Sequence, residues 1–362
     1  MTKKTTKNTS SDKIIPFPAK HSFKHPTLDL FQTFLCNTDL EQEQLSNTLD
    51  LWDSVPRYSI SRQNMGKLRV NGGFLDLLEL EFQYRGTPMK AIIQPARIKE
   101  RDGATRDYYP SANEELVEDA LRKIAAEQSQ GYLSTDPPEH CSGVVFTLHQ
   151  LRRELRERGH ARSYREIVMS LNILVRSTIE LRASNGDMQG FTVSGYLSGL
   201  RSVSRQNMKE DPEAKWVAQF HPLVTRSMES LGYRQFNYHQ MMSHSTQLAR
   251  WLHKQLALKF TFAGIGAKFD LHFSTVKRDS GLLEGYSRQR DAVNALKAAL
   301  AELKTNRVLM LIEKKCTYGA RGKLEDVVYS LHASREFIAE AKAANKRRSL
   351  AAEKLVNPEK TT

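Results

Sequence analysis

The sequence predicts an α+β fold of two tandem winged-helix domains, mostly helical with β-hairpin wings, preceded by a disordered basic N-terminal arm. Two helix-then-hairpin patterns, about 125 residues apart, are the main reason. The first helix is expected over residues 163–179 and the second over residues 287–304. Each carries apolar residues at a period of 3.6 and leads into a strand–turn–strand pattern. The polar, lysine-rich first 25 residues predict the arm.

The two helices align along their apolar faces. The coinciding positions, which we expect to be buried, are Val168, Leu171 and Val175 in the first helix and Val293, Leu296 and Leu300 in the second. The opposite stripes are Arg165, Met169, Asn172 and Arg176, and Arg290, Asn294, Lys297 and Ala301. An exposed stripe of Arg, Asn and Lys beside a hairpin suits contact with a groove of a double helix.

The charge of the chain favours a polyanionic partner. Lys and Arg outnumber Asp and Glu by 54 to 41, which gives a net charge of +13 and a pI near 9.5. Nucleic acid is the commonest such partner, although charge alone also fits a basic protein that binds none. The three cysteines are scattered, so we expect free thiols. With no apolar run of membrane-spanning length and no signal-peptide pattern, we expect a cytoplasmic protein.

In the first half, residues 27–52 carry an apolar pattern expected to pack as small helices, and the first ordered domain is expected from Tyr58. Alternation over residues 67–99, around two glycine turns, predicts strands and hairpins. A helix is expected over 113–128, then a strand over 144–146. Thr147 is the expected N-cap of a helix over 148–158, and Ser163 that of the aligned helix. Strands over 178–183 and 191–196 are expected to form the first wing.

The second half is expected to repeat this plan. It begins with a strand over 216–220, a short helix from Pro222 and a loop or strand over 233–238. Helices are expected over 245–258 and 269–283 before the aligned helix. Strands over 308–314 and 324–331 flank residues 319–323 as the second wing, and a terminal helix is expected over 334–356. The pentapeptide Ser-Arg-Gln-Asn-Met occurs at 61–65 and again at 204–208, which fits a duplication or coincidence.

These elements give five predicted segments. They are a disordered basic arm over 1–25, a short helical lead-in over 26–57, a first winged-helix domain with a strand-rich insertion over 58–205, a second winged-helix domain over 206–345 and a basic tail over 346–362.

The patterns of phosphate loops and catalytic metal sites are missing. Residues 319–323 lack the P-loop spacing and residues 264–266 lack a third glycine, so we expect no bound nucleotide or other cofactor. No two histidines are separated by one residue, which argues against the His-x-His metal site of a nicking enzyme. Acid pairs such as Glu79/Glu81 and Glu114/Glu115 are expected to be exposed and solvated. We expect neither a metal site nor an enzyme.

The candidate DNA-binding residues are polar or cationic and lie on the two aligned helices, the turn before each and the second wing. Arginine suits both phosphate and guanine because its planar fork donates two parallel hydrogen bonds. Lysines on a wing suit backbone contact. The candidates are Arg162, Ser163, Arg165, Asn172, Arg176, Ser287, Arg288, Gln289, Arg290, Asn294, Lys297, Lys314, Lys315, Arg321 and Lys323.

On these residues the chain resembles the RepA-type plasmid replication initiators, an iteron-binding, tandem winged-helix family. The resemblance spans residues 58–345 and is clearest at 80–84, 95–96, 109–128 and 245–262. It implies a C-terminal domain that reads repeated origin sites in the major groove and an N-terminal domain that contacts the DNA backbone and can mediate dimers. It places Arg288, Gln289, Arg290, Asn294 and Lys297 where the base-reading residues belong.

The resemblance implies a sequence-specific double-stranded DNA-binding protein that initiates plasmid replication and helps to open the origin. It further implies repression of its own gene as a homodimer, a monomeric active form, and recruitment of a host initiator and a replicative helicase in the bacterial cytoplasm. The alternative is a tandem winged-helix transcriptional regulator without a replication role, since the same helices would serve. A nicking replicase is disfavoured by the missing His-x-His pair.

Overall fold

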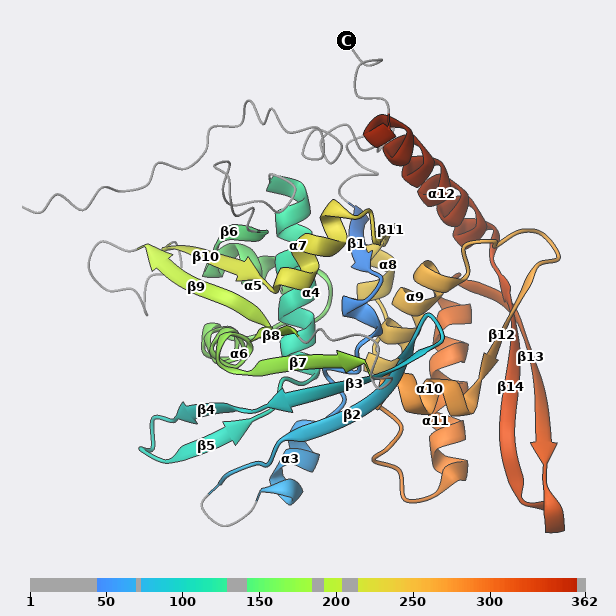
Figure 1. The fold of residues 1–362 in the computed structure, drawn as a ribbon, viewed down its shortest axis with the longest axis horizontal. Helices are drawn as coiled ribbons and strands as arrows, with labels where there is room; N and C mark the ends of the chain where they lie inside the picture. Colours follow the sequence, from blue (N-terminus) through green and yellow to red (C-terminus); the bar gives the residue numbers. More distant parts are fainter. Residues whose placement is uncertain (1–43, 70–72, 129–141, 184–191, 204–213, 357–362) are drawn as a thin grey trace, which may run out of the picture.

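A computed structural model describes residues 44–69, 73–128, 142–183, 192–203 and 214–356 (Figure 1). The chain has a mixed α/β fold with several small antiparallel sheets. Buried apolar side chains form two large clusters, one drawn from residues 49–242 together with Ala257 and the other from residues 248–341. The division between the two cores therefore falls between α8 (Tyr238–Met242) and α9 (Gln247–Lys259).

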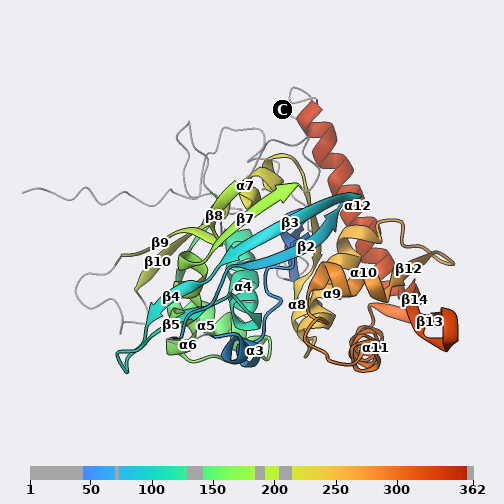
Figure 2. The same ribbon diagram turned by 60° about the horizontal axis from the view of Figure 1, so that its bottom comes forward.

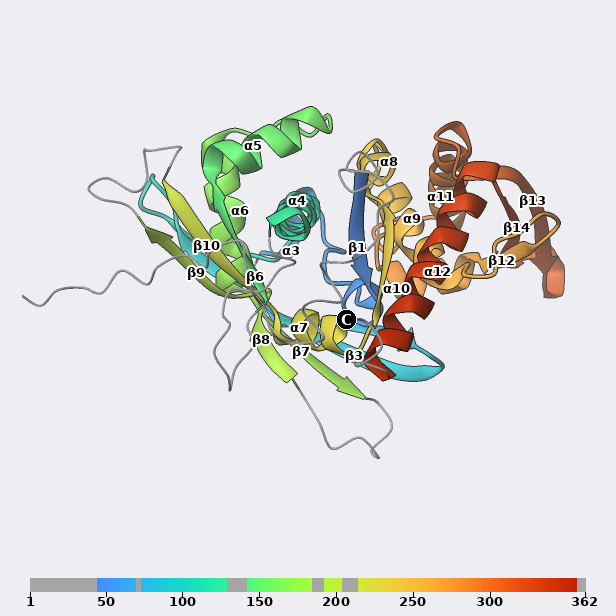
Figure 3. The ribbon, with the colours of Figure 1, turned by 90° about the horizontal axis from the view of Figure 1, so that it is seen from above.

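The first cluster is built around α4, a long helix that other elements surround (Figure 3). Its elements are β1 (Leu45–Leu49), η1 (Trp52–Ser54), α3 (Arg62–Leu68), β2 (Leu78–Tyr84), β3 (Thr87–Gln94), β4 (Ala96–Lys99), β5 (Thr105–Tyr108), α4 (Ala112–Gln128), β6 (Gly143–Thr147), α5 (Leu148–Glu157), α6 (Tyr164–Arg176), β7 (Thr178–Ala183), β8 (Thr192–Gly195), β9 (Leu197–Val203), β10 (Lys215–Phe220), α7 (Pro222–Glu229), β11 (Tyr233–Asn237) and α8.

Four small sheets cover this cluster. They have the strand orders β2-β3-β7-β8, β6-β10-β9, β4-β5 and β1-β11. The hairpin predicted after α6 is confirmed, because β7 pairs with β8 from Thr178↔Gly195 to Leu181↔Thr192. It belongs to a different sheet from β6, however, since β7 also pairs with β3 while β6 pairs with β10.

The second cluster follows the order helix, strand, helix, helix, hairpin, helix. After α9 come β12 (Lys268–His272), α10 (Phe273–Ser280), α11 (Gln289–Thr305), β13 (Leu309–Tyr318), η2 (Ala320–Gly322), β14 (Leu324–Ala333) and α12 (Arg335–Val356). Strand β14 lies between β12 and β13 in one sheet. Figure 2 shows α9, α10 and α11 gathered beside this sheet, with α12 crossing behind them.

Local capping fixes several helix ends where the sequence predicted them. The Thr147 hydroxyl accepts from the backbone N–H of Gln150 at 3.0 Å, and Ser163 and Glu166 form a reciprocal capping box at the start of α6. Gly281 ends α10 with a φ of +64°, a conformation that glycine adopts without steric cost. These interactions satisfy backbone groups that a helix cannot satisfy internally.

The junction between the two clusters is ionic. Lys254 of α9 is buried and lies 2.9 Å from Glu115 and 3.0 Å from Asp119, both on α4. Arg122 of α4 in turn bonds Asp53 of η1 at 2.8 Å, and Gln255 of α9 donates to the Asp53 carbonyl at 2.8 Å. Because a buried charge without its partner is strongly unfavourable, this network holds α4 and α9 together.

The same network corrects the prediction for Glu114 and Glu115. Both were expected to be solvated, but both are buried. Glu114 caps its own helix through the backbone N–H of Ser111 (2.9 Å) and accepts from Arg62 at 2.7 Å. The apolar spacing of the helix could not indicate this burial, because the partners lie on distant segments. Glu79 and Glu81 are exposed, as predicted.

Three other expectations about the fold were wrong. Residues 45–49, predicted as helical, form β1, which pairs with β11 from Leu45↔Asn237 to Leu49↔Tyr233. Residues 268–272 form a strand, so the helix expected over 269–283 is confined to α10. Strand β10, assigned by its sequence position to the second domain, pairs with β6 and β9 of the first cluster.

Some predicted features lie outside the described residues. These are the basic arm over 1–25, most of the lead-in, the proposed domain boundary at 205/206, the second copy of the pentapeptide, Cys36 and Cys141. In the described part, Ser61 of the first copy caps α3, and Cys316 is a free thiol. The predicted terminal helix is confirmed as α12, which continues into the segment expected to be a tail. No described helix has the length and apolarity needed to span a membrane.

Candidate nucleic-acid interface

Helix α11 presents a polar and cationic face to solvent. Its apolar face is buried as predicted, with Val293, Leu296 and Leu300 in the second cluster. The opposite side and the preceding turn are exposed, and they carry Ser287, Arg288, Gln289, Arg290, Asn294 and Lys297. These six candidates therefore form one continuous surface along the first half of the helix, defined here as the α11 face.

The α11 face has few internal partners. The Arg290 side chain is 77% exposed, and its one ion-pair partner in the described part of the chain is Asp291, at 3.7 Å, a weak pair in water. The N-cap residue, Arg288, makes no side-chain hydrogen bond to the first turn. The start of the helix therefore has no side-chain cap from Arg288, and the helix dipole there favours an anion.

The β13–β14 hairpin adds a second cationic surface next to α11. Both strands are ten residues long, and their lysines Lys314, Lys315 and Lys323 are exposed. The side chain of Arg321, the fourth candidate here, lies outside the described part of the chain. At the tip, the Gly319 N–H donates to the Lys323 carbonyl at 2.9 Å, which closes the turn. Figure 1 shows the hairpin projecting at one end of the molecule.

Three of the candidate DNA-binding residues around α6 make hydrogen bonds within the protein, unlike those of the α11 face. The guanidinium of Arg162 donates to Asn113 Oδ1 at 2.8 Å, which ties the turn before α6 to α4. Ser163 is engaged in the capping box with Glu166. The Asn172 side chain donates to the Val168 carbonyl at 2.8 Å within the helix and is half-buried. These three side chains serve the local structure.

Arg165 and Arg176 are the exposed candidates on α6. They lie near the two ends of the helix, and between them Met169 is half-buried and Ile173 fully buried. The cover is the β4–β5 hairpin, because Ile173 packs with Ala96 and Ile98 in a small separate cluster. The middle of α6 is therefore closed to a large ligand such as a DNA groove.

The covering hairpin contributes cations that the sequence analysis overlooked. Lys99 and Arg101 are exposed and make no ion pair among the described residues, whereas Arg106 bonds Glu100 at 2.7 Å and Asp102 at 3.0 Å. The alternation of cationic and apolar residues over 97–99 could have identified the outer face that includes Lys99, since alternate residues of a strand point the same way. The free cations beside α6 thus include residues from a hairpin far away in sequence.

Comparison of the chain with known proteins gives matches among solved structures. No family model and no curated protein matches it. Among solved structures it is similar to a selenomethionine crystal structure of domains 2 and 3 of RctB, with a TM-score of 0.45 and 11% identity, covering 71% of this chain and 91% of that one.

A second crystal structure of RctB domains 2–3 gives a TM-score of 0.43 and 10% identity over 74% of this chain and 94% of that one. The Pi initiator protein in complex with iteron DNA gives 0.40 and 12% over 67% and 98%. By its description the last is an initiator bound to iteron DNA. At such identities these similarities assign no residue of this chain a role.

Proposed function

We propose that the chain binds double-stranded DNA sequence-specifically through the α11 face, with the β13–β14 hairpin on the phosphate backbone. The observation that carries this is the α11 face itself: six polar or cationic side chains, exposed together on one helix beside three exposed lysines. We assign a winged helix to the second cluster, made of α9, β12, α10, α11 and the β13–β14 hairpin. The order of these elements and the β12-β14-β13 sheet support the assignment.

The first cluster supplies a supporting surface. Helices α4, α5 and α6 with β6 have the corresponding order, and β9–β10, which pairs with β6, is the hairpin that would complete a second winged helix. Arg165, Arg176, Lys99 and Arg101 are exposed there without ion-pair partners in the described part. Cations spread over a covered helix and a hairpin suit phosphates better than base edges, so this part would position the protein on DNA.

We further propose that the protein initiates plasmid replication at repeated sites and has no catalytic step of its own. The sequence resemblance to RepA-type initiators supports this role, as well as the expected homodimer, host initiator and helicase partners. Binding to several adjacent repeats would strain the duplex and make a neighbouring A·T-rich tract easier to open. The alternative, a transcriptional regulator, uses the same α11 face.

Two experiments test the proposal. In the first, the full chain selects sites from a random duplex library, and affinity for the enriched site is followed against salt; a steep inverse dependence is expected because bound cations release counterions from phosphates. Failure to enrich any site would contradict sequence-specific binding.

In the second, a plasmid that carries only a candidate origin is introduced into cells that supply the protein in trans. Replication is expected only if the protein is an initiator, whereas repression of a reporter without replication would favour the regulator. A relaxation assay on supercoiled plasmid with a divalent metal should show no nicking; nicking would refute the absence of catalysis.

A further inference from the structure

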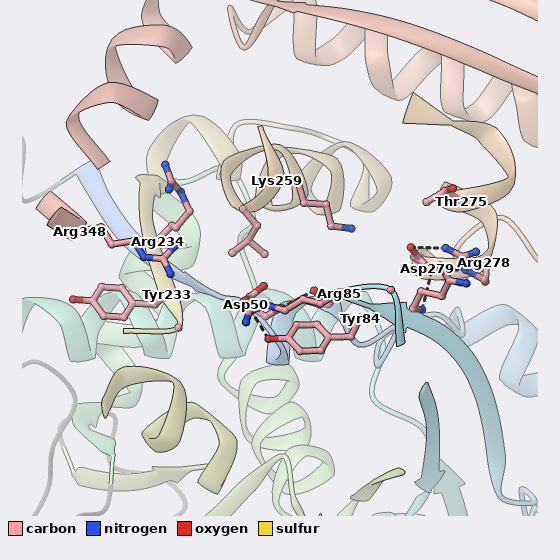
Figure 4. A pocket seen from close by; sticks show the side chains of 15 residues that line it. Asp50, Tyr84, Arg85, Tyr233, Arg234, Lys259, Thr275, Arg278, Asp279 and Arg348 are labelled. Atoms are coloured by element: carbon pink, nitrogen blue, oxygen red, sulfur yellow. Dashed lines mark hydrogen bonds and ion pairs between the residues drawn. The ribbon is translucent and has the colours of Figure 1, made fainter. Parts of the chain in front are cut away.

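A polar cavity of about 530 Å³ lies where the two clusters meet (Figure 4). The first cluster lines it with the turn between β2 and β3 and with β11. The second lines it with the end of α9, with α10 and with α12. Its volume falls in the range of small-molecule sites. A ligand in this cavity would touch both parts of the protein at once.

The cavity wall carries an excess of positive charge. Its cations are Arg85, Arg234, Lys259, Arg278 and Arg348, and its carboxylates are Asp50 and Asp279. Arg85 is paired with Asp50, and Arg278 makes two hydrogen bonds to Asp279, at 2.6 and 3.0 Å. Figure 4 shows both pairs as dashed lines. The two carboxylates are therefore already neutralised.

Three cations remain without an ion-pair partner in the described part of the chain: Arg234, Lys259 and Arg348. They come from three different elements, β11, α9 and α12. Glu340 is the acid whose charge acts on Arg234, but its carboxylate accepts from the Asn237 N–H at 2.8 Å, and burial raises its pKa to about 7. Glu340 is thus only partly ionised near neutral pH and compensates Arg234 poorly.

The hydrogen bonds of Arg234, in addition to the unpaired cations, also point to an anion in the cavity. Its side chain is only 6% exposed, and its Nη2 donates to the neutral acceptors Asn345 Oδ1 (2.8 Å) and the Ala341 carbonyl (3.5 Å). Its Nε is buried without a hydrogen-bond partner in the described part of the chain. A buried guanidinium with an unused donor is unfavourable, and an anion beside it would supply the missing acceptor.

We propose that this cavity binds a small polyphosphate anion, whose phosphates contact Arg234, Lys259 and Arg348. Guanidinium and ammonium groups contributed to one cavity wall by separate elements suit a multiply charged phosphate group, whose chain can extend from one cation to the next. The missing phosphate loops do not oppose such a site, because here side chains and not a glycine-rich loop supply the donors. The bound anion would link β11 of the first cluster to α9 and α12 of the second.

The phosphate of bound DNA is a poor candidate for the same site. Figures 2 and 3 place the β2–β3 turn and the C-terminal end of α12 on the side of the molecule away from α11. A duplex lying on the α11 face would pass along the other side. The source is therefore a free polyphosphate, either inorganic or part of a nucleotide.

The test is a titration of the full chain with sodium pyrophosphate, tripolyphosphate and ATP at constant ionic strength, followed by calorimetry and by the melting temperature. Saturable binding with a rising melting temperature is expected, because a ligand that binds only the folded state stabilises it. Lys259→Gln and Arg348→Gln, both at exposed positions, should each weaken binding at least tenfold. Lys342→Gln and Lys346→Gln, exposed on the same α12, are the matched controls and should leave it unchanged.

The outcomes separate cleanly. Equal affinity for tripolyphosphate and ATP assigns the site to the phosphate chain, and tighter ATP binding assigns it to a nucleotide. No saturable binding, equal losses in the α12 controls, or displacement of pyrophosphate by duplex DNA would overturn the proposal. Since Arg290→Ala should leave pyrophosphate binding intact, failure here is distinguishable from failure of DNA recognition by α11.

Discussion

Helices α6 and α11 share one apolar spacing but differ in what lies over their outer faces. The fully buried Ile173 of α6 aligns with Ala298 of α11, 125 positions later, which is exposed. The half-buried Met169 and Asn172 align in the same way with the exposed Asn294 and Lys297. The difference comes from the β4–β5 hairpin, which packs on α6 and has no counterpart over α11 among the described residues. Two helices with the same inner face can therefore have different functions.

Under the proposed function, this difference favours α11 over α6 as the base-reading helix. A helix enters the major groove only if its outer face is free over several turns, and that holds for α11. The exposed arginines near the ends of α6 can still reach phosphates. The predictions below test this contrast, beginning with the contact that holds the two units in one body.

The largest effect is expected from Lys254→Met at the ionic junction. The substitution leaves Glu115 and Asp119 buried without their cation, so the free energy of unfolding should fall by about 3–5 kcal/mol. Urea denaturation at pH 7 measures it, with the exposed Lys304→Met of α11 as the control. A loss equal to that of the control would show that the junction contributes nothing.

The next test compares the two aligned outer positions directly. Ile173→Ala removes a buried side chain beneath the hairpin and should lower the free energy of unfolding by about 2–4 kcal/mol. Ala298→Ser, at the exposed counterpart, should change it by no more than about 0.5 kcal/mol. Similar changes at both positions would mean that α6 is not covered in solution.

Acid should destabilise both units through buried histidines. His221 stacks on the ring of Trp52 in the first cluster. The rings of His244 and His253 are hydrogen-bonded at 2.9 Å. Burial lowers the pKa of His221 and of His244 to about 4. Between pH 6.5 and 4 each of these histidines binds more protons in the unfolded chain than in the folded one, so its contribution to stability is lost as pH falls. The expected loss at pH 5 is roughly 2 kcal/mol per histidine. Buried Glu340, whose pKa is raised, acts in the opposite direction, so the measurement uses Glu340→Gln. Denaturation curves of that variant from pH 7 to 5 that show constant or rising stability would contradict this.

The smallest effect is expected at the wing. Lys323→Ala should weaken binding to specific and shuffled duplexes about equally and lower the salt slope by about one, because a lone exposed lysine contacts phosphate without reading sequence. Fluorescence anisotropy over a range of salt concentrations measures both. A loss confined to the specific site would instead make Lys323 a base contact.

Much of the fold was accessible from sequence, because it depends on local rules. The helix periods, the Thr147 and Ser163 caps and the β13–β14 hairpin were predicted from residues close together in the chain. The errors concern partners far apart in sequence. Residues 45–49 form a strand because β11 is available to pair with them, nearly 190 positions away.

The candidate site, like the fold, was predictable where it depends on residues close together in the sequence. The α11 face is exposed as expected, since periodicity alone decides which side of that helix is buried. On α6 the same periodicity was correct for Leu171 but could not reveal that β4 covers Met169 and Ile173. The cavity and its unpaired Arg234 were missed because elements far apart in the sequence, from η1 and β2 to α12, create them.

The most direct test of the central claim uses the aligned pair Arg165 and Arg290, both exposed. Each is changed to alanine, and binding to the selected site is measured against a shuffled duplex at equal salt. Arg290→Ala should reduce the preference for the selected site by about 1–3 kcal/mol, and Arg165→Ala should weaken both duplexes equally and leave the preference intact. Loss of preference in Arg165→Ala but not in Arg290→Ala would contradict the assignment of base reading to α11.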